Sequence, residues 1–345
     1  MRKYAHLLII LLLSIVTIFA LLRLGNIDIS LETLARVKGL WLFLGFVAFY
    51  VSVVARGLRW QHILHAMGWR VGSIYAQTLL TAGLFISSVL PARAGDVGRV
   101  AMLKQDYKIP VSQGAASIAA ERALDVFSVL ILAAIGAIWA LRGRIPPEAL
   151  QLIIGVTILF VLGLVGLLAV PSLEAWLRRL GQIMPAKIRP LYQKALDFGF
   201  SLIHSLRDLG RKPFALMLIV AESFITWLLD AVIVHFVLLS LNITVPFSVS
   251  LASSMLGVLA TIVPLMPGAL GQYEAGMIGL LTLAGVPPAE STLAALLVRF
   301  ISLWSFIPIS GFITYIFGFS RALSLKGVNP DEKPSVAPSP TPLES

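Results

Sequence analysis

The chain has 345 residues, of which 58% are hydrophobic and 13% are charged, whereas soluble domains carry roughly 25% charged residues. This composition excludes a water-soluble two-domain protein, and the absence of cysteine excludes thiol catalysis, cysteine-ligated metals and a disulfide framework. We interpret the net charge of +10, from 27 Lys and Arg against 17 Asp and Glu, as basic cytoplasmic loops of a membrane protein and not as a nucleic-acid surface.

Six long apolar runs predict membrane-crossing helices, because the hydrocarbon core needs roughly 20 helical residues. The first run follows Arg2 and Lys3 and lacks a small-residue cleavage site, so we expect a retained helix and not a signal peptide. Two further apolar stretches, Ile74–Leu90 and Phe247–Met266, end at Pro and Gly. The six runs are Ala5–Leu22, Leu40–Ala55, Ala115–Ala140, Leu150–Val170, Phe214–Leu241 and Leu293–Phe319.

Loop charge predicts the orientation of these helices in a cell inner membrane. The basic segment 172–212 is expected in the cytoplasm, together with both termini, and the uncharged Asn242–Pro246 is expected outside. Arg142 and Arg144 fall outside, against this trend. Arg56, Arg59 and Arg70 follow the second run and belong inside, where the Arg59-Trp60-Gln61 stretch is typical of an interfacial anchor.

The chain divides into a polytopic membrane domain, residues 1–319, and a tail, residues 320–345, that we predict to be disordered and cytoplasmic because of its Pro and Ser content. Within the cytoplasmic segment 172–212, apolar residues at helical spacing predict an amphipathic helix that acts as a packing linker or in regulation. These residues are Ile188, Leu191, Ala195, Phe198 and Leu202.

An internal similarity relates a repeat A, about residues 5–140, to a repeat B, about residues 150–319. Pro91 to Gly95 matches Pro267 to Gly271, and each motif is followed 19 or 20 residues later by a second proline, Pro110 or Pro287. Twelve residues beyond each second proline lies an arginine, Arg122 or Arg299.

Loop charge places the two copies in opposite orientations, which predicts an all-α integral membrane protein with an inverted repeat and two re-entrant helical hairpins. In transporters of this kind the binding site lies between the repeats. Non-helical backbone survives at membrane depth only where protein or a wet cavity covers it. The alternative is an ordinary interfacial turn between full helices. The residues expected to break the helices are Pro91, Gly95, Pro264, Pro267, Gly268 and Gly271.

Charged residues inside the apolar segments are candidates for function, because burying them in a membrane is costly. The alternative is internal ion pairing, of Glu121 or Asp125 with Arg299 and of Glu274 with Arg122. Two arginines suit a phosphate, because a guanidinium stays charged and donates a planar fork of hydrogen bonds. No metal or cofactor is expected, since the five histidines do not cluster and no nucleotide-binding glycine loop occurs. The candidates are Arg93, Asp96, Arg99, Glu121, Arg122, Asp125, Glu222, Asp230, Glu274 and Arg299.

Three motifs, Leu84 to Arg99, Glu121 to Asp125 and Pro267 to Glu274, resemble the flippase-like membrane domain of lysylphosphatidylglycerol synthases. The resemblance implies movement of lipid between leaflets. Because only a short Pro-rich stretch follows Phe319, we do not expect the aminoacyl transferase activity of the two-part synthases. The positions that match the family motifs are Arg93, Asp96, Arg99, Glu121, Arg122, Asp125 and Glu274, whereas Arg299 comes from the repeat alone.

The leading hypothesis is a lipid flippase, and not an enzyme, that carries an anionic or glycosylated lipid between leaflets by alternating access. Arg122 and Arg299 would bind the phosphate, and Glu121, Asp125 and Glu274 would balance charge or carry a coupling proton. Alternatives are a lipid-modifying enzyme with Glu121 and Asp125 as acid and base, a non-transporting partner of a glycosyltransferase, and a small-solute carrier. A lipid-synthesising enzyme is a possible partner, nucleic acid is not expected, and the oligomeric state stays open.

Overall fold

The computed structural model describes residues 37–89, 94–140, 189–261 and 267–326, together with residues 155, 158, 162, 174 and 176–180. The regular secondary structure in these ranges is helical, with short turns between the helices. They include four stretches long and apolar enough to cross a membrane, Gly39–Ala66, Val111–Ala140, Pro213–Ser240 and Pro288–Gly318. The protein is therefore an all-α integral membrane protein with several membrane-crossing helices. The predicted run Ala5–Leu22, most of Leu150–Val170, the turn residues Pro91, Arg93 and Pro264, and the end of the tail lie outside the described residues.

The helices fall into two similar sets, separated along the chain by α8 (Arg189–Gly210). The first half contains α3 (Gly39–Ala66), α4 (Ser73–Val89), α5 (Ala94–Tyr107) and α6 (Val111–Ala140). The second half contains α9 (Pro213–Ser240), α10 (Phe247–Leu259), the short η1 (Pro267–Ala269), α11 (Gln272–Leu283), α12 (Pro288–Arg299), the π-helical η2 (Phe300–Trp304) and α13 (Phe306–Lys326).

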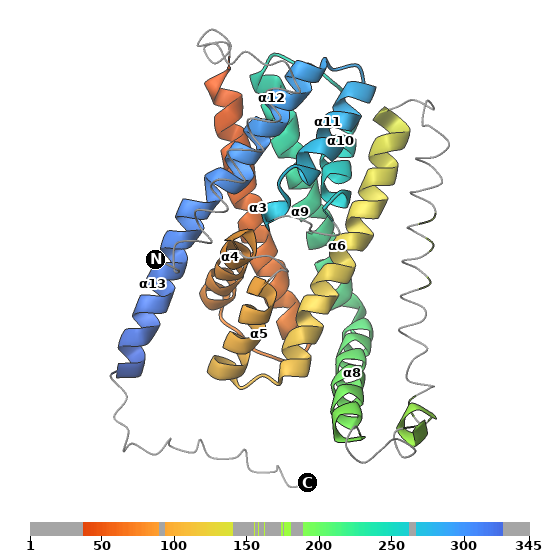
Figure 1. The fold of residues 1–345 in the computed structure, drawn as a ribbon, viewed down its shortest axis with the longest axis vertical. Helices are drawn as coiled ribbons and strands as arrows, with labels where there is room; N and C mark the ends of the chain where they lie inside the picture. The colour runs from red at the N-terminus through yellow and green to blue at the C-terminus, as the bar shows by residue number, and fades with distance from the viewer. Residues whose placement is uncertain are drawn as a thin grey trace.

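Each half contains one pair of short helices joined at a break. In the first half α4, of 17 residues, packs against α5, and in the second half α10, of 13 residues, packs against α11. Both α4 and α10 are shorter than the roughly 20 residues of a full span. The end of α4 lies beside η1 near the centre of the molecule, since a Cβ on Gly268 would lie 3.7 Å from the carbonyl oxygen of Ser88 (Figure 1).

The two halves contact each other through matching helices. The first helices of the halves, α3 and α9, run side by side in opposite directions, and the backbone N–H of Lys38 donates to the carbonyl oxygen of Ser240 at one end. The last helix of each half covers the short helix of the other, because α6 packs on α10 and α13 packs on α4. Small residues permit this closeness, since a Cβ on Gly136 of α6 would lie 2.8 Å from the backbone nitrogen of Ala252 on α10.

Helix α3 corrects one prediction. The second apolar run was expected to end at Ala55, but the helix continues to Ala66 and includes Arg56 and Arg59. The hydropathy pattern ends at the first charge, whereas the helix continues because those charges have partners in the neighbouring helices. These partners form the candidate site.

Candidate functional site

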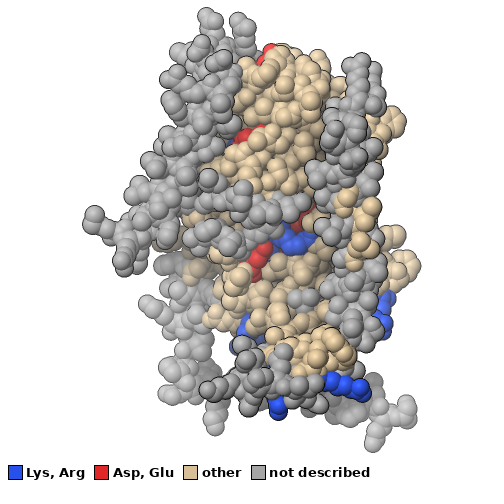
Figure 2. Space-filling model, turned by 45° about the vertical axis from the view of Figure 1, so that its right-hand side comes forward, with Lys and Arg blue, Asp and Glu red and all other residues tan. Residues whose placement is uncertain are grey.

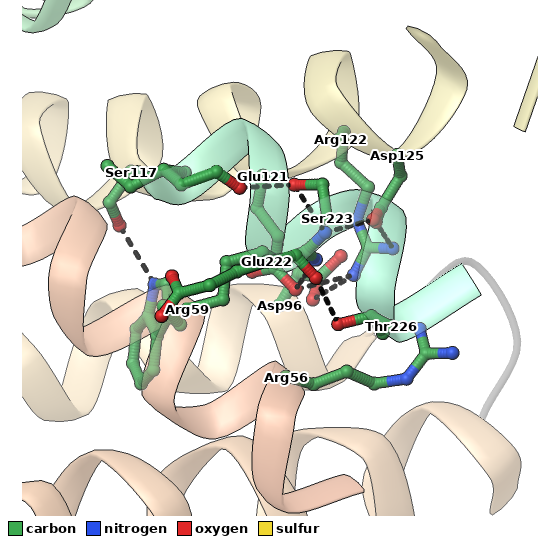
Figure 3. Close-up of polar contacts among 12 residues, drawn as sticks. Arg56, Arg59, Asp96, Ser117, Glu121, Arg122, Asp125, Glu222, Ser223 and Thr226 are labelled. Carbon is green, nitrogen blue, oxygen red and sulfur yellow. Dashed lines mark hydrogen bonds and ion pairs between the residues drawn. The ribbon is translucent and has the colours of Figure 1, made fainter. Parts of the chain in front are cut away.

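Six charged side chains from α3, α5 and α6 form a compact group that we call the first-half cluster. Its members are Arg59, Asp96, Arg99, Glu121, Arg122 and Asp125. Arg99 Nη2 lies 2.7 Å from Glu121 Oε2, and Arg59 Nη1 lies 2.7 Å from Asp125 Oδ1. Arg122 lies within 3.5 Å of both Asp96 and Asp125, and Arg59 Nη2 lies 3.6 Å from Glu121 Oε1. Three positive charges therefore face three negative charges, and the side chains converge from neighbouring helices (Figure 3).

Burial divides this cluster into a closed side and an open side. The side chains of Arg59 and Arg99 are 0% and 1% exposed, whereas Arg122 is 33% exposed. On the closed side the Arg99 guanidinium lies 3.9 Å from the ring centre of Trp60, and the Trp227 indole N–H donates to Asp125 at 3.1 Å. On one face of the molecule, basic and acidic atoms reach the surface at mid-height among uncharged residues (Figure 2).

The positive and negative side chains of the cluster stabilise one another in the bundle. Removing a charge from water costs several kcal/mol per ion, and only close opposite charges and hydrogen bonds offset that cost. Glu121 lies about 15 Å along α6 from its first residue, since a helix rises 1.5 Å per residue, and among the described residues its charge is compensated by Arg59, Arg99 and Arg122. The cluster can therefore stay neutral without a ligand, and its exposed members are Arg122 and Asp96.

Arg59 is the member of the cluster that the sequence interpretation missed. The expectation of an interfacial anchor at Arg59 and Trp60 is wrong, because both side chains are fully buried. A sequence signal existed in the spacing of Arg56, Arg59 and His62, which are three residues apart and thus lie along one side of a helix.

Among the described residues, the second half carries one ion pair at its break, which we call the second-half pair. Arg299 Nε on α12 lies 2.7 Å from Glu274 Oε1 on α11, and Arg299 Nη2 donates to the carbonyl oxygen of Ala269 at 2.8 Å. The guanidinium also lies 4.8 Å from the ring centre of Tyr273. This pair fastens the turn after η1 to α12.

The ion pairs among the described residues do not follow the predicted partners. Pairing of Glu121 or Asp125 with Arg299, and of Glu274 with Arg122, was the structural alternative, and it is wrong in its partners. The arginines of the first-half cluster pair within the first half, and Arg299 pairs with Glu274 in the second half. The reason is proximity, because each α5 or α11 helix packs directly on the helix that follows it.

The residues at the two breaks occupy different backbone environments. Gly268 and Gly271 have φ values of +61° and +81°, which favour glycine, and Pro267 begins η1. Gly95 instead lies inside the first turn of α5, where a Cβ would overlap the carbonyl oxygen of Gly83 on α4. Gly95 therefore permits close helix packing and does not itself form the turn.

A row of polar contacts joins α3 to α9 across the boundary between the halves. Arg56 Nη2 lies 2.7 Å from Asp230 Oδ2, Arg59 Nη1 donates to Ser223 Oγ at 3.1 Å, and His62 Nδ1 lies 2.7 Å from Glu222 Oε1. Glu222 and Asp230, which are eight residues apart on α9, thus both contact α3 but have separate partners.

A cavity of about 220 Å³ lies beside the Arg56–Asp230 pair, and we call it the interface cavity. Helices α3 and α4 of the first half contribute Phe49, Val53, Arg56, Leu84 and Ser88. The second half contributes Asp230, Ile233, Tyr273, Val298, Ser302 and Phe306. No group of three or more His, Asp or Glu suited to a metal ion occurs in the part of the chain that the structure describes.

Residues 5–310 match the family model described as the lysylphosphatidylglycerol synthase TM region. The chain belongs to this family. It is 28% identical over 236 residues to a UPF0104 membrane protein of Methanocaldococcus jannaschii, which covers 68% of this chain and 94% of the relative. A UPF0104 membrane protein of Methanothermobacter thermautotrophicus is 23% identical over 323 residues, or 88% of this chain and 92% of the relative.

A further relative is named glycosyltransferase AglD, from Haloferax volcanii. It is 29% identical over 288 residues, which are 73% of this chain and 45% of the relative. This family member therefore spans less than half of that glycosyltransferase. No solved structure matches the chain.

Proposed function

We propose that this protein moves a phosphate-bearing lipid or glycolipid between the two leaflets of the membrane. The observation that carries the proposal is the interface cavity, which is lined by residues of both halves and contains an ion pair among apolar walls. A lipid that crosses a bilayer keeps its acyl chains in the hydrocarbon while its headgroup needs a polar path. A cavity with charged residues between two sets of membrane helices suits that task.

The packing supports an inverted-repeat mechanism of alternating access. The end of α4 meets η1 near the centre, and the contacts of α6 with α10 and of α13 with α4 are reciprocal. In inverted-repeat transporters the substrate site lies at the repeat interface near the midplane. We infer that the pairs α4–α5 and α10–α11 are re-entrant hairpins, and that movement of one half against the other exposes the cavity to each leaflet in turn.

Charge supports an orientation with both termini in the cytoplasm and a location in the cell inner membrane. Basic atoms gather at the end of the molecule that lies lowest in Figure 2, where α3 ends and α6 begins. Cytoplasmic loops of membrane proteins carry such an excess of Lys and Arg. Among the described residues at this end are Arg70, Lys104, Lys108, Arg207, Arg211 and Lys212.

Arg122 and Arg299 are the arginines that we assign to the phosphate during translocation. Arg122 is the most exposed arginine of the first-half cluster, and Arg299 lies at the second break beside Tyr273, a wall residue of the interface cavity. Glu121, Asp125 and Glu274 balance their charge when no lipid is bound. The relative named as a glycosyltransferase favours a lipid-synthesising enzyme as partner.

Leaflet exchange in reconstituted vesicles tests this function. Lipids with a fluorescent acyl chain are added, and the fraction that an impermeant quencher reaches is followed over time. We expect wild-type protein to accelerate exchange, and Arg122→Gln and Arg299→Gln to abolish the acceleration while Arg211→Gln retains it. Wild-type vesicles that exchange lipid no faster than protein-free vesicles would contradict transport, and formation of a new lipid product in detergent would favour a membrane-embedded enzyme.

A further inference from the structure

The strongest unassigned site in the described residues is the Arg56–Asp230 pair at the wall of the interface cavity. Arg56 Nη2 lies 2.7 Å from Asp230 Oδ2, and Ser52 Oγ donates to Asp230 Oδ1 at 2.9 Å. The Arg56 guanidinium lies 4.6 Å from the ring centre of Trp227. The two charges thus come from opposite halves of the molecule and meet at the cavity.

This pair differs from the buried pairs of the first-half cluster in its accessibility. The side chains of Arg56 and Asp230 are 18% and 21% exposed, whereas Arg59 and Arg99 are essentially closed off. Arg56 lies about 15 Å from the lower end of α3, and Asp230 lies about 15 Å from the opposite end of α9, at 1.5 Å per residue. The pair is therefore near the middle of the helices and open to the cavity.

We propose that the interface cavity binds a zwitterionic lipid headgroup, with its phosphate on Arg56 and its ammonium group on Asp230. This inference rests on the proposed transport function: it names the headgroup class and adds Arg56 and Asp230 as the pair that holds the headgroup in the cavity, separate from the contacts of the phosphate with Arg122 and Arg299 during translocation. The site itself is neutral, because it offers one positive and one negative charge. A purely anionic headgroup that took Arg56 would leave the partly buried Asp230 carboxylate with only the Ser52 hydroxyl as a partner, and the loss of its opposite charge there is unfavourable.

A zwitterionic headgroup avoids that penalty because it replaces both partners at once. The Arg56 guanidinium offers the planar set of donors that matches a phosphate. Asp230 offers a carboxylate to an ammonium group, and the aromatic side chains of Phe49, Tyr273 and Phe306 line the same cavity. Ser88 and Ser302 add hydroxyl groups from the two halves.

The size of the cavity agrees with a headgroup alone. Its volume of about 220 Å³ equals about seven water molecules at roughly 30 Å³ each. Pockets for drug-sized ligands measure about 300–1,000 Å³, so acyl chains do not fit and would remain in the hydrocarbon. The cavity wall includes the π-helical segment η2, which carries Ser302, and π-helical turns are frequent at functional sites.

Binding in detergent tests the inference apart from transport. Short-chain phosphatidylethanolamine and short-chain phosphatidylglycerol are titrated into the purified full chain by calorimetry. We expect the zwitterionic lipid to bind about tenfold more tightly than the anionic lipid. Arg56→Gln and Asp230→Asn should each weaken binding of phosphatidylethanolamine by about tenfold or more, and Arg211→Gln, on an exposed arginine paired with Asp208, should leave it unchanged.

Ser302→Leu keeps the test decisive if either charge variant fails to fold, because it fills the cavity and leaves the Arg56–Asp230 pair in place. It should weaken binding of phosphatidylethanolamine as the charge variants do. Equal or tighter binding of phosphatidylglycerol would overturn the headgroup class, and wild-type affinity in folded Ser302→Leu would overturn the location. Either result could accompany normal leaflet exchange of lipids, which would leave the proposed function intact.

Discussion

The two halves of the molecule use very different numbers of charged residues to join the helix after the break to the helix that follows it. In the first half, the helix after the break is joined to the next long helix by a cluster of three arginines and three carboxylates. In the second half, one pair, Glu274 and Arg299, does the equivalent task. Asp96 of α5 pairs with Arg122 in the same sense as Glu274 of α11 pairs with Arg299, but the reversed pair of Arg99 with Glu121 has no counterpart among the described residues of the second half. Similar helix arrangements therefore do not require similar residues at matching places.

The difference indicates a division of roles between the halves. The first-half cluster includes Arg59 of α3, so it also fastens α3 to α6. The second-half pair is bound to the turn itself, because Arg299 also binds the backbone at Ala269. We expect the first half to be the more rigid one and the second break to be the more mobile one.

The largest effect is expected for Glu121→Gln. This substitution removes the carboxylate that accepts from Arg99 and faces Arg59, and so leaves two buried guanidinium groups with too few partners. Breaking a buried pair from one side typically costs about 3–5 kcal/mol. The free energy of unfolding, measured by titration of mixed micelles with a denaturing detergent, should fall by this amount. A smaller loss than that caused by Glu274→Gln would contradict the comparison.

A smaller effect is expected for Glu274→Gln in the second half. Arg299 keeps the carbonyl oxygen of Ala269 and the face of Tyr273, and its side chain is 11% exposed. The loss of unfolding free energy should therefore be about 1–3 kcal/mol. Hydrogen exchange should increase most in η1 and α11, and an increase centred on α5 would show that the two halves are not independent.

At the two glycines near the breaks, alanine and asparagine should differ in stability cost in opposite orders. Gly268 has φ +61° and ψ +11°, close to the left-handed helical region, so alanine there should cost about 1–2 kcal/mol, and asparagine should cost less because it tolerates that conformation. Gly95 needs space, so asparagine should cost more than alanine. Thermal unfolding followed by tryptophan fluorescence distinguishes the two orders, and the same order at both sites would contradict the assigned backbone roles.

The smallest effect is expected for Arg211→Gln. Arg211 and Asp208 have exposed side chains and form an ion pair in solvent. Such pairs contribute little to stability. Unfolding in the same detergent titration should be unchanged, which makes this variant the reference for arginine neutralisation elsewhere. A loss comparable with that of Glu274→Gln would show that position in the bundle does not control these effects.

The helices and breaks followed from the sequence because they depend on local patterns. Long apolar runs are sufficient to predict α6 and α9, and Pro267, Gly268 and Gly271 mark the second break. The charged candidates of the first half, from Asp96 to Asp125, also come together in the structure, although Arg93 lies outside the described residues.

The partners of these charges depend on tertiary packing and were not predictable in the same way. A hydropathy run ends at Arg56 whether that arginine lies at a membrane surface or pairs with Asp230 inside the bundle. The inclusion of Arg59 in the first-half cluster required knowledge that α3 packs against both α6 and α9. The sequence feature that points to a polar side of α3 is the three-residue spacing of Arg56, Arg59 and His62, which the sequence interpretation did not use.

The most direct test of a lipid path between the halves uses a single cysteine at Ser302, because the chain contains no other cysteine. Ser302→Cys protein in vesicles is treated with a charged thiol reagent, and leaflet exchange is measured before and after labelling. Lys194→Cys, at an exposed position on α8, is the labelled control. Labelling should stop exchange in Ser302→Cys and leave it unchanged in Lys194→Cys. Undiminished exchange after complete labelling at position 302, or a thiol there that never reacts, would contradict a water-accessible path through the interface cavity.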